Sequence, residues 1–217
     1  MENGIKHPTL GEKTFEQIKN MILSGRILPG ERLLYSRLVH DLGVSQTPIK
    51  EAFTRLENEG YVVTVQRKGT FARKFSQREI REAFEIREML EALAARSACL
   101  HAEAASLDRL EKINARFAAS ARRRDVKACT REDYAFHETL IDMSGNAKLK
   151  ELMNRANYHL QSIAQNGPDF LKISGEYSAM HARIIRAIGE RDADAAERLV
   201  REHIRFGMDE VLPAVSV

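Results

Sequence analysis

Apolar residues recur along most of this chain at intervals of three and four, the spacing that places them on one face of an α-helix. Phe15, Ile18 and Ile22 share such a face in the segment from Lys13 to Ser24. From residue 76 onward every segment has this period. The predicted helices there run from Ser76 to near His101, from Ser106 past Phe117, from Asp125 to Gly145, from Asn146 to near Pro168, through Tyr177 to Gly189, and from Asp192 to Pro213. Their short connections predict an all-helical antiparallel bundle.

Residues 36–71 have a different pattern, which begins with two short helices. Leu38 and Leu42 lie on one face of the first helix, and Gly43-Val44 predicts a tight turn after it. Ser45 is a suitable N-cap for a second helix, Gln46–Asn58, with Pro48 tolerated in its first turn. Two helices joined in this way predict a helix-turn-helix.

A basic hairpin follows the second helix. Tyr61–Val65 and Thr70–Ala72 are predicted as short strands around a turn at Arg67-Lys68-Gly69. The whole unit is typical of a winged helix-turn-helix, which inserts the first turn of its second helix into the major groove of DNA. The candidate DNA-contacting residues are Arg37, Ser45, Gln46, Thr47, Lys50, Lys68 and Gly69. A solvated surface is the alternative for each polar residue alone, but the turn and the hairpin together favour DNA binding.

Composition and charge fit a two-domain intracellular protein. Residues 1–75 hold 12 Lys and Arg against 8 Asp and Glu, a net charge of +4, whereas the remaining residues have a net charge of −1. The positive excess lies in the half that we expect to meet phosphates. Cys99 and Cys129 are interpreted as buried apolar residues in a reducing compartment. We find no signal core and no run of about eighteen apolar residues, and so expect a cytoplasmic protein without a membrane segment.

The domain boundary is predicted at the end of the wing. Ser76 with Glu79 forms a capping box, the usual start of a helix. We therefore assign residues 1–75 to the DNA-binding domain and residues 76–217 to the helical domain.

Four residues of the helical half carry metal-binding chemistry. Asp133 and His137 are four positions apart and project from one helix face, while His181 and His203 lie on two later helices among apolar neighbours. A carboxylate and three imidazoles can hold Zn²⁺, Ni²⁺, Mn²⁺ or Fe²⁺. Taken singly, a histidine in such a position is more often a hydrogen-bonded core or surface residue than a metal ligand. Arg87 is interpreted as a cation for an effector carboxylate, or as the ion-pair partner of Glu91.

The chain resembles the GntR family of bacterial transcription regulators, in its FadR-like group with an FCD effector domain. The residues that carry this resemblance are Pro29-Gly30-Glu31-Arg32-Leu33, Leu42-Gly43-Val44-Ser45, Thr47-Pro48, Glu51-Ala52, Arg55-Leu56, Glu59-Gly60 and Gly69 in the first half. In the second half they are Glu85-Ile86-Arg87, Leu90-Glu91, Asp133, Ala135-Phe136-His137, His181 to Ile185, Ala187-Ile188, Asp192, Asp194 to Ala196 and His203-Ile204.

The resemblance implies a homodimer that binds a palindromic double-stranded operator. It also implies that Asp133, His137, His181 and His203 hold a divalent metal, with Zn²⁺ first among the candidates, beside which a small organic acid binds. Gln46 and Lys50 stand where the family usually has arginine, which predicts an altered operator sequence.

We therefore expect a ligand-responsive DNA-binding regulator, most simply a repressor, with no catalytic residues. The alternatives are a metal-dependent enzyme domain fused to the DNA reader, and a regulator whose metal is purely structural.

Overall fold

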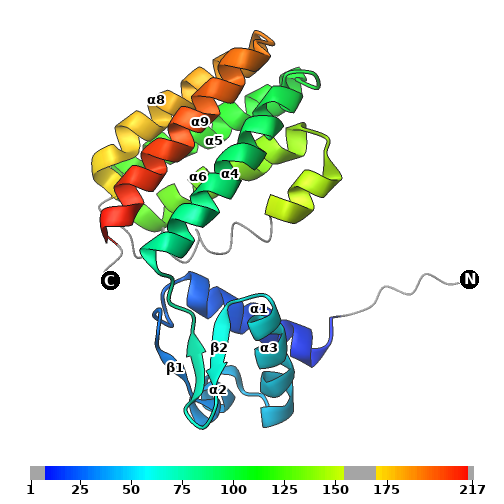
Figure 1. The fold of residues 1–217 in the computed structure, drawn as a ribbon, viewed down its shortest axis with the longest axis vertical. Helices are drawn as coiled ribbons and strands as arrows, with labels where there is room; N and C mark the ends of the chain where they lie inside the picture. The colour runs from blue at the N-terminus through cyan, green and yellow to red at the C-terminus, as the bar shows by residue number, and fades with distance from the viewer. Residues whose placement is uncertain (1–7, 154–169, 215–217) are drawn as a thin grey trace, which may run out of the picture. The chain divides into compact units, whose positions relative to one another are not determined.

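The computed structural model describes residues 8–153 and 170–214, which divide into two compact units. Unit 1 comprises residues 1–74 and unit 2 comprises residues 75–217 (Figure 1). The predicted fold class is confirmed, because the first unit is a winged helix-turn-helix and the second a helical bundle. No helix among the described residues is both long enough and apolar enough to cross a membrane.

Unit 1 consists of three helices and a small antiparallel sheet. Its helices are α1 (Leu10–Leu23), α2 (Tyr35–Leu42) and α3 (Gln46–Asn58), and its strands are β1 (Arg32–Leu33), β2 (Val62–Val65) and β3 (Gly69–Ala72). The strand order is β1-β3-β2, with Val65 opposite Gly69 at the hairpin end. Helix α1 packs on α3, and Phe15, Ile18, Ile49 and Leu56 form a fully buried core between them. Each such side chain contributes about 1.5–3 kcal/mol through burial.

Three local features differ from the predictions. Helix α1 begins at Leu10, earlier than predicted, because Thr9 and Glu12 form a capping box. Strand β1 was not predicted, since two residues are too few to show an alternating pattern. Ser45 occupies the N-cap position of α3 as predicted, but its side chain makes no capping hydrogen bond.

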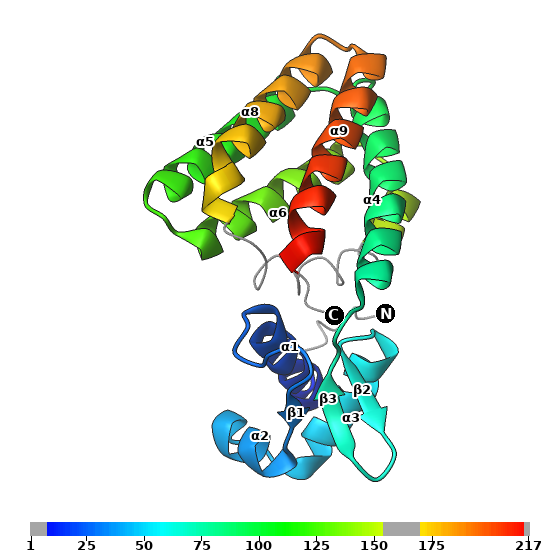
Figure 2. The same ribbon diagram turned by 60° about the vertical axis from the view of Figure 1, so that its left-hand side comes forward.

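Unit 2 is a bundle in which each helix packs against its neighbours in a closed ring. The helices are α4 (Gln77–Ala98), α5 (Ala104–Arg122), α6 (Val126–Met143), α8 (Phe170–Gly189) and α9 (Ala193–Val211), with a 3₁₀ turn at Leu212–Ala214. The contacts run from α4 to α9, α8, α5 and α6, and from α6 back to α4 (Figure 2). Residues 147–153 are helical, and the rest of the helix predicted to end near Pro168 lies outside the described residues.

The start of α4 confirms the predicted capping box. The Ser76 hydroxyl accepts from the backbone N–H of Glu79, and the Glu79 carboxylate accepts from the backbone N–H of Ser76. These bonds satisfy two N–H groups that the first turn of a helix otherwise leaves without partners. Helix α4 therefore begins five positions after β3 ends, which makes it the first bundle element that follows the wing along the chain.

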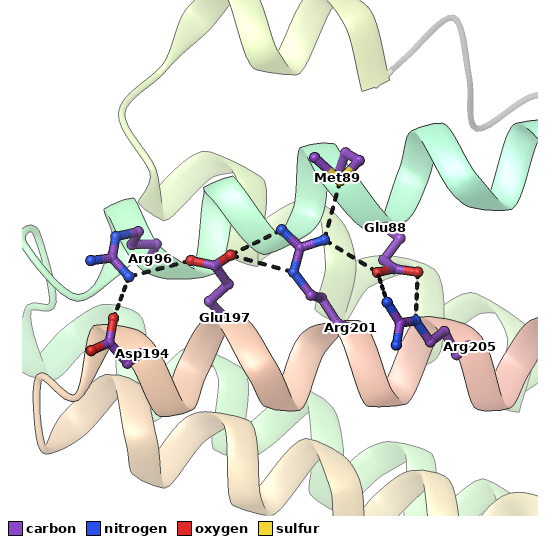
Figure 3. A network of polar contacts seen from close by, with 7 residues as sticks. All are labelled: Glu88, Met89, Arg96, Asp194, Glu197, Arg201 and Arg205. Atoms are coloured by element: carbon purple, nitrogen blue, oxygen red, sulfur yellow. Dashed lines mark hydrogen bonds and ion pairs between the residues drawn. The ribbon is translucent and has the colours of Figure 1, made fainter.

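The outer seam between α4 and α9 is closed by charged side chains of alternating sign (Figure 3). Glu88 of α4 accepts hydrogen bonds from both Arg201 and Arg205 of α9. Farther along the seam, Arg96 of α4 pairs with Asp194 and Glu197. Glu88 and Arg201 are partly buried, whereas Arg96, Asp194 and Arg205 are exposed. Ion pairs with an exposed member contribute little, so we attribute the register of the two helices mainly to the apolar residues beneath them.

Candidate metal centre and DNA-reading surface

The recognition-helix candidates lie together on an exposed surface. Gln46, Thr47 and Lys50 occupy the first two turns of α3 and are exposed, while Pro48 and Ile49 between them are buried. Gly43, which ends α2, has a φ of +64°, a conformation that L-residues with a Cβ rarely adopt. The chain turns here between α2 and α3, and the polar side chains at the start of α3 remain exposed.

The wing presents a second basic surface. Lys68 is exposed at the hairpin turn, and Gly69 follows it with a φ of +110°. A Cβ at Gly69 would lie only 2.9 Å from Nε of Arg32, so the guanidinium of β1 rests directly against the wing. Sequence reasoning did not single out Arg32, because its strand was not recognised. Arg37, by contrast, pairs with Glu31 at 2.9 Å and Asp41 at 3.7 Å, which leaves it half exposed.

The four candidate metal ligands converge inside the bundle. Asp133 and His137 come from α6, and His181 and His203 come from α8 and α9. One ligand atom from each lies within 4.8 Å of every other. The three imidazoles are buried, and the carboxylate of Asp133 is 17% exposed. Residues separated by up to 70 positions in the chain thus form one cluster.

The spacing of the ligand atoms fits coordination of a single ion. Nε2 of His137 lies 3.1 Å from Nε2 of His203 and 3.8 Å from Oδ1 of Asp133. Nε2 of His181 lies 3.4 Å from the same Oδ1 atom. Two atoms bound to one Zn²⁺ at about 2.0–2.1 Å lie roughly 3–4 Å apart. The donor set of three imidazole nitrogens and one carboxylate oxygen suits a borderline divalent cation.

Several polar atoms of this cluster have no hydrogen-bond partner among the described residues. They are Oδ1 of Asp133, both ring nitrogens of His181 and Nδ1 of His203. Buried polar atoms almost always have partners, so an unpaired group of this kind requires an explanation. A cation that accepts lone pairs from Asp133 and His181 would satisfy the unpaired oxygen and one of the nitrogens.

The pKa shifts of His181, His203 and Asp133 favour the protonation states that a metal requires. Burial lowers the pKa of His181, although Asp133 opposes this effect, and burial together with His181 and His137 lowers the pKa of His203 well below its usual value. Burial alone would raise the pKa of Asp133, but the neighbouring imidazoles of His181 and His137 lower it. Neutral imidazoles and an ionised carboxylate are the forms that bind metal.

Aromatic rings surround the cluster. Phe136 stacks on His181 with ring centres 3.8 Å apart, and Phe117 meets the same imidazole edge-on. Tyr177, one turn before His181 on α8, packs edge-on against His203 at 4.9 Å. Burial raises the pKa of the Tyr177 hydroxyl, so it stays protonated. These rings fix the orientation of the imidazoles and exclude water around them.

Arg87 reaches the cluster through a buried carboxylate. Its Nε donates to Oε1 of Glu91 at 2.5 Å, and Oε2 of Glu91 lies 2.5 Å from Nδ1 of His137. Sequence reasoning offered Glu91 as a partner for Arg87 because the two are one helical turn apart. It missed the contact with His137, since nothing in the sequence indicates that α4 and α6 meet at these positions.

The fold and the cluster define a winged helix-turn-helix domain joined to a helical domain that contains a buried polar cluster. Comparison with known families agrees: residues 10–72 match the bacterial regulatory proteins of the gntR family, and residues 82–206 match the FCD domain. The chain therefore belongs to the GntR family of DNA-binding transcriptional regulators, in the group with an FCD domain. The family and its curated relatives are regulators and not enzymes, as predicted.

Two curated relatives match along most of their length. The chain is 30% identical over 197 residues to YdhC, an uncharacterized HTH-type transcriptional regulator of Bacillus subtilis (strain 168), covering 87% of this chain and 85% of the relative. It is 27% identical over 197 residues to the Nta operon transcriptional regulator of Aminobacter aminovorans, covering 90% and 91%. A solved structure of a proposed GntR transcriptional regulator from Rhodococcus sp. RHA1 superposes with a TM-score of 0.83 at 20% identity, covering 95% and 99%.

Proposed function

We propose that this regulator is a homodimeric, metal-containing repressor whose operator affinity responds to a small carboxylic acid. The observation that carries the proposal is the convergence of Asp133, His137, His181 and His203 from three helices on one buried point. Such a cluster is costly to bury without a cation, because its polar atoms then remain unpaired.

The donor set supports Zn²⁺ first, with Ni²⁺, Mn²⁺ and Fe²⁺ as alternatives. When bound, the metal supplies a positive charge and a coordination position for the carboxylate of an acid. Asp133 is the only one of the four ligands that is partly exposed, which supports entry of the acid from its side of the cluster.

Arg87 is the residue that we propose to meet the acid. Its side chain is 14% exposed and its charge lies close enough to lower the pKa of Asp133 together with the imidazoles. An acid held between a metal and a guanidinium would have its negative charge bound by two positive groups. Because Arg87 lies on α4, which follows the wing along the chain, a shift of α4 can alter how the DNA-reading units are presented.

DNA binding is proposed to use both exposed surfaces of unit 1. Gln46 suits an adenine edge and Lys50 suits guanine or phosphate. Ser45 and Thr47, at the start of α3, are proposed to contact the DNA backbone. Lys68 and Gly69 are proposed to approach the adjacent groove or backbone. Arg37 is already paired with two carboxylates, so its proposed role is a contact with phosphate at the edge of the interface.

The homodimer is supported by the operator chemistry and by one surface of the bundle. A single recognition helix reads one half-site, and a two-fold dimer reads a palindrome. Ile86, Met89 and Leu93 lie on one face of α4 and are 54%, 60% and 48% exposed. Three large apolar side chains at intervals of three and four positions are unusual on a solvated helix and suit contact with a second copy. We propose that the protein acts on its operator in the cytoplasm.

The alternative is a metal that is purely structural. The experiment that separates the two measures operator affinity of metal-loaded, tag-free protein while carboxylic acids are titrated in. A thermal-shift screen first selects the acids that raise the melting temperature, since a ligand selective for the folded state stabilises it. The proposal expects at least one such acid to weaken operator binding by about 5- to 150-fold. Acids that stabilise the protein without changing operator affinity would support the structural alternative.

A further inference from the structure

A fully buried carboxylate links α4 to the proposed metal centre. Glu91 has no exposed surface, and its two oxygens are used by different partners. Oε1 accepts from Nε of Arg87 on the same helix, and Oε2 faces Nδ1 of His137 on α6 at 2.5 Å. A charged group of this kind is expensive to bury and persists only with such partners.

The contacts of Glu91 favour its ionised form. Oε1 accepts from the guanidinium of Arg87, a group that can only donate, and Oε2 faces a ring nitrogen of His137. An ionised carboxylate can only accept hydrogen bonds, so the proton between the two groups belongs to Nδ1 of His137. The lone pair of His137 then lies on Nε2, the atom that is 3.1 Å from Nε2 of His203 and faces Asp133.

We infer that Glu91 is the positioning residue of the metal centre: it fixes the tautomer and the ring orientation of His137, while Arg87 holds Glu91 in place. The inference rests on the proposed metal site. Hydrogen bonds from metal-bound imidazoles to carboxylates raise the basicity of the ligand and orient the ring. Here the contacts run from the partly exposed Arg87, through the buried carboxylate of Glu91, to the ligand imidazole of His137. Arg87 and Glu91 both belong to α4.

These contacts connect α4, the helix that follows the wing along the chain, to the proposed metal ligand His137. None of the four proposed ligands lies on α4, and Glu91 gives this helix a direct contact with the ligand imidazole of His137. An acid that engages Arg87 must share this guanidinium with Glu91. Binding at Arg87 and binding at the metal are therefore expected to be linked, and linkage acts in both directions.

The same helix offers a matched control at Glu88. This carboxylate is also held by arginines, Arg201 and Arg205, but it lies on the outer seam of α4 and α9 (Figure 3). Replacing Glu88 by Gln removes one ion-paired carboxylate from α4, as replacing Glu91 does, without touching the metal cluster.

The test measures Zn²⁺ affinity by competition with a chromophoric chelator, using the tag-free full chain. We expect Glu91→Gln to weaken Zn²⁺ binding by about 10- to 100-fold relative to wild type, the usual effect of losing an outer-shell partner. Glu88→Gln is expected to stay within twofold of wild type. Equal Zn²⁺ affinities for Glu91→Gln and Glu88→Gln, in variants that keep their melting transitions, would overturn the inference while leaving the proposed function intact. Wild type that takes up none of Zn²⁺, Ni²⁺, Mn²⁺ and Fe²⁺ would instead defeat the proposed function itself.

A second readout gives a decisive result with wild type alone. Nitrogen-15 spectra of histidine-labelled wild type report which ring nitrogen of His137 carries the proton. The inference predicts a single form with the proton on Nδ1, and predicts that Glu91→Gln mixes the two tautomers in the metal-free protein. A proton on Nε2 of His137 in wild type would contradict the inference, because Glu91 would then not be accepting from Nδ1.

Discussion

The two units of this protein hold their polar functional residues in opposite ways. In unit 1 the candidate DNA-contacting side chains are exposed and come from one stretch of chain, α2 to β3. In unit 2 the candidate metal ligands are mostly buried and come from α6, α8 and α9. An exposed polar group can be removed at little cost to folding, whereas a buried polar cluster is part of the core. Substitutions in the two units should therefore separate DNA affinity from stability.

The largest effect is expected from removing a buried ligand. His203→Ala deletes one of the four donors and is expected to weaken binding of Zn²⁺ by more than about 100-fold, beyond the effect of losing an outer-shell partner. Competition with a chelator measures the affinity. Arg205→Ala, two positions along α9 and on its outer face, is the matched control and should leave the affinity unchanged. Retention of wild-type affinity by His203→Ala would remove this residue from the site.

Metal removal should destabilise unit 2 and spare unit 1. A bound ligand at a concentration 100 times its Kd contributes about 2.7 kcal/mol of stability, and a chelator abolishes this contribution. Calorimetry of the full chain with and without a chelator measures the loss. The transition assigned to the bundle should fall in temperature, while hydrogen exchange of α1 and α3 stays the same. Equal hydrogen-exchange protection of the α6 and α8 amides with and without the chelator would contradict the expected difference between the two units.

Substitution of an exposed apolar residue of the bundle should weaken the dimer without changing metal binding. Leu93→Glu places a charge on the exposed face of α4 and is expected to raise the dissociation constant of the dimer by at least about tenfold, with metal affinity unchanged. Sedimentation analysis measures the change. Leu152→Glu introduces the same charge at another half-exposed leucine and serves as the control. A dimer that is equally weakened by both substitutions would show that the α4 face has no special role.

In unit 1 the recognition helix should give the next largest effect. Gln46→Ala removes an exposed side chain that we expect to pair with a base, at a cost of about 1–3 kcal/mol in operator binding. Binding to operator variants at each position, measured by fluorescence anisotropy, tests this effect. Specificity should relax at one base pair, and the melting temperature should not change. A uniform loss across all operator variants would assign Gln46 to the phosphate backbone instead.

The smallest effect is expected at the wing. Lys68→Ala removes one exposed charge and should weaken binding to all sequences about equally. The slope of log affinity against log salt should fall by about one. Lys112→Ala in α5, which removes a paired surface charge from the bundle, provides the comparison. An unchanged salt slope for Lys68→Ala would exclude a phosphate contact at the wing.

The contrast between features built from one stretch of chain and features built from distant helices also explains how much of the structure could be predicted from the sequence. The bounds of α3, Gln46–Asn58, followed from Ser45, Pro48 and the stop at Glu59-Gly60, and they are confirmed. The capping box of Ser76 and Glu79 is likewise local and is confirmed. The equivalent pair at Thr9 and Glu12 obeys the same rule but was overlooked, so α1 was predicted too short.

The metal centre could not be derived in this way. The spacing of Asp133 and His137 placed two donors on one helix face, but no local rule fixes which faces of α8 and α9 meet them. His181 and His203 were candidates because they lie among apolar neighbours on later helices, and the family resemblance assigned them to the same site as the other two. The structure places all four within reach of one another. Glu91 was missed as a partner of His137 because a glutamate in a helix is usually solvated, and only packing of α4 on α6 buries it.

The most direct test of the central claim is metal analysis of the tag-free full chain, purified without a chelator. The account predicts one divalent ion per chain in wild type, and loss of that ion when both Asp133 and His181 are replaced by Ala. Wild-type protein without a stoichiometric ion, or a double variant that keeps its ion, would contradict it.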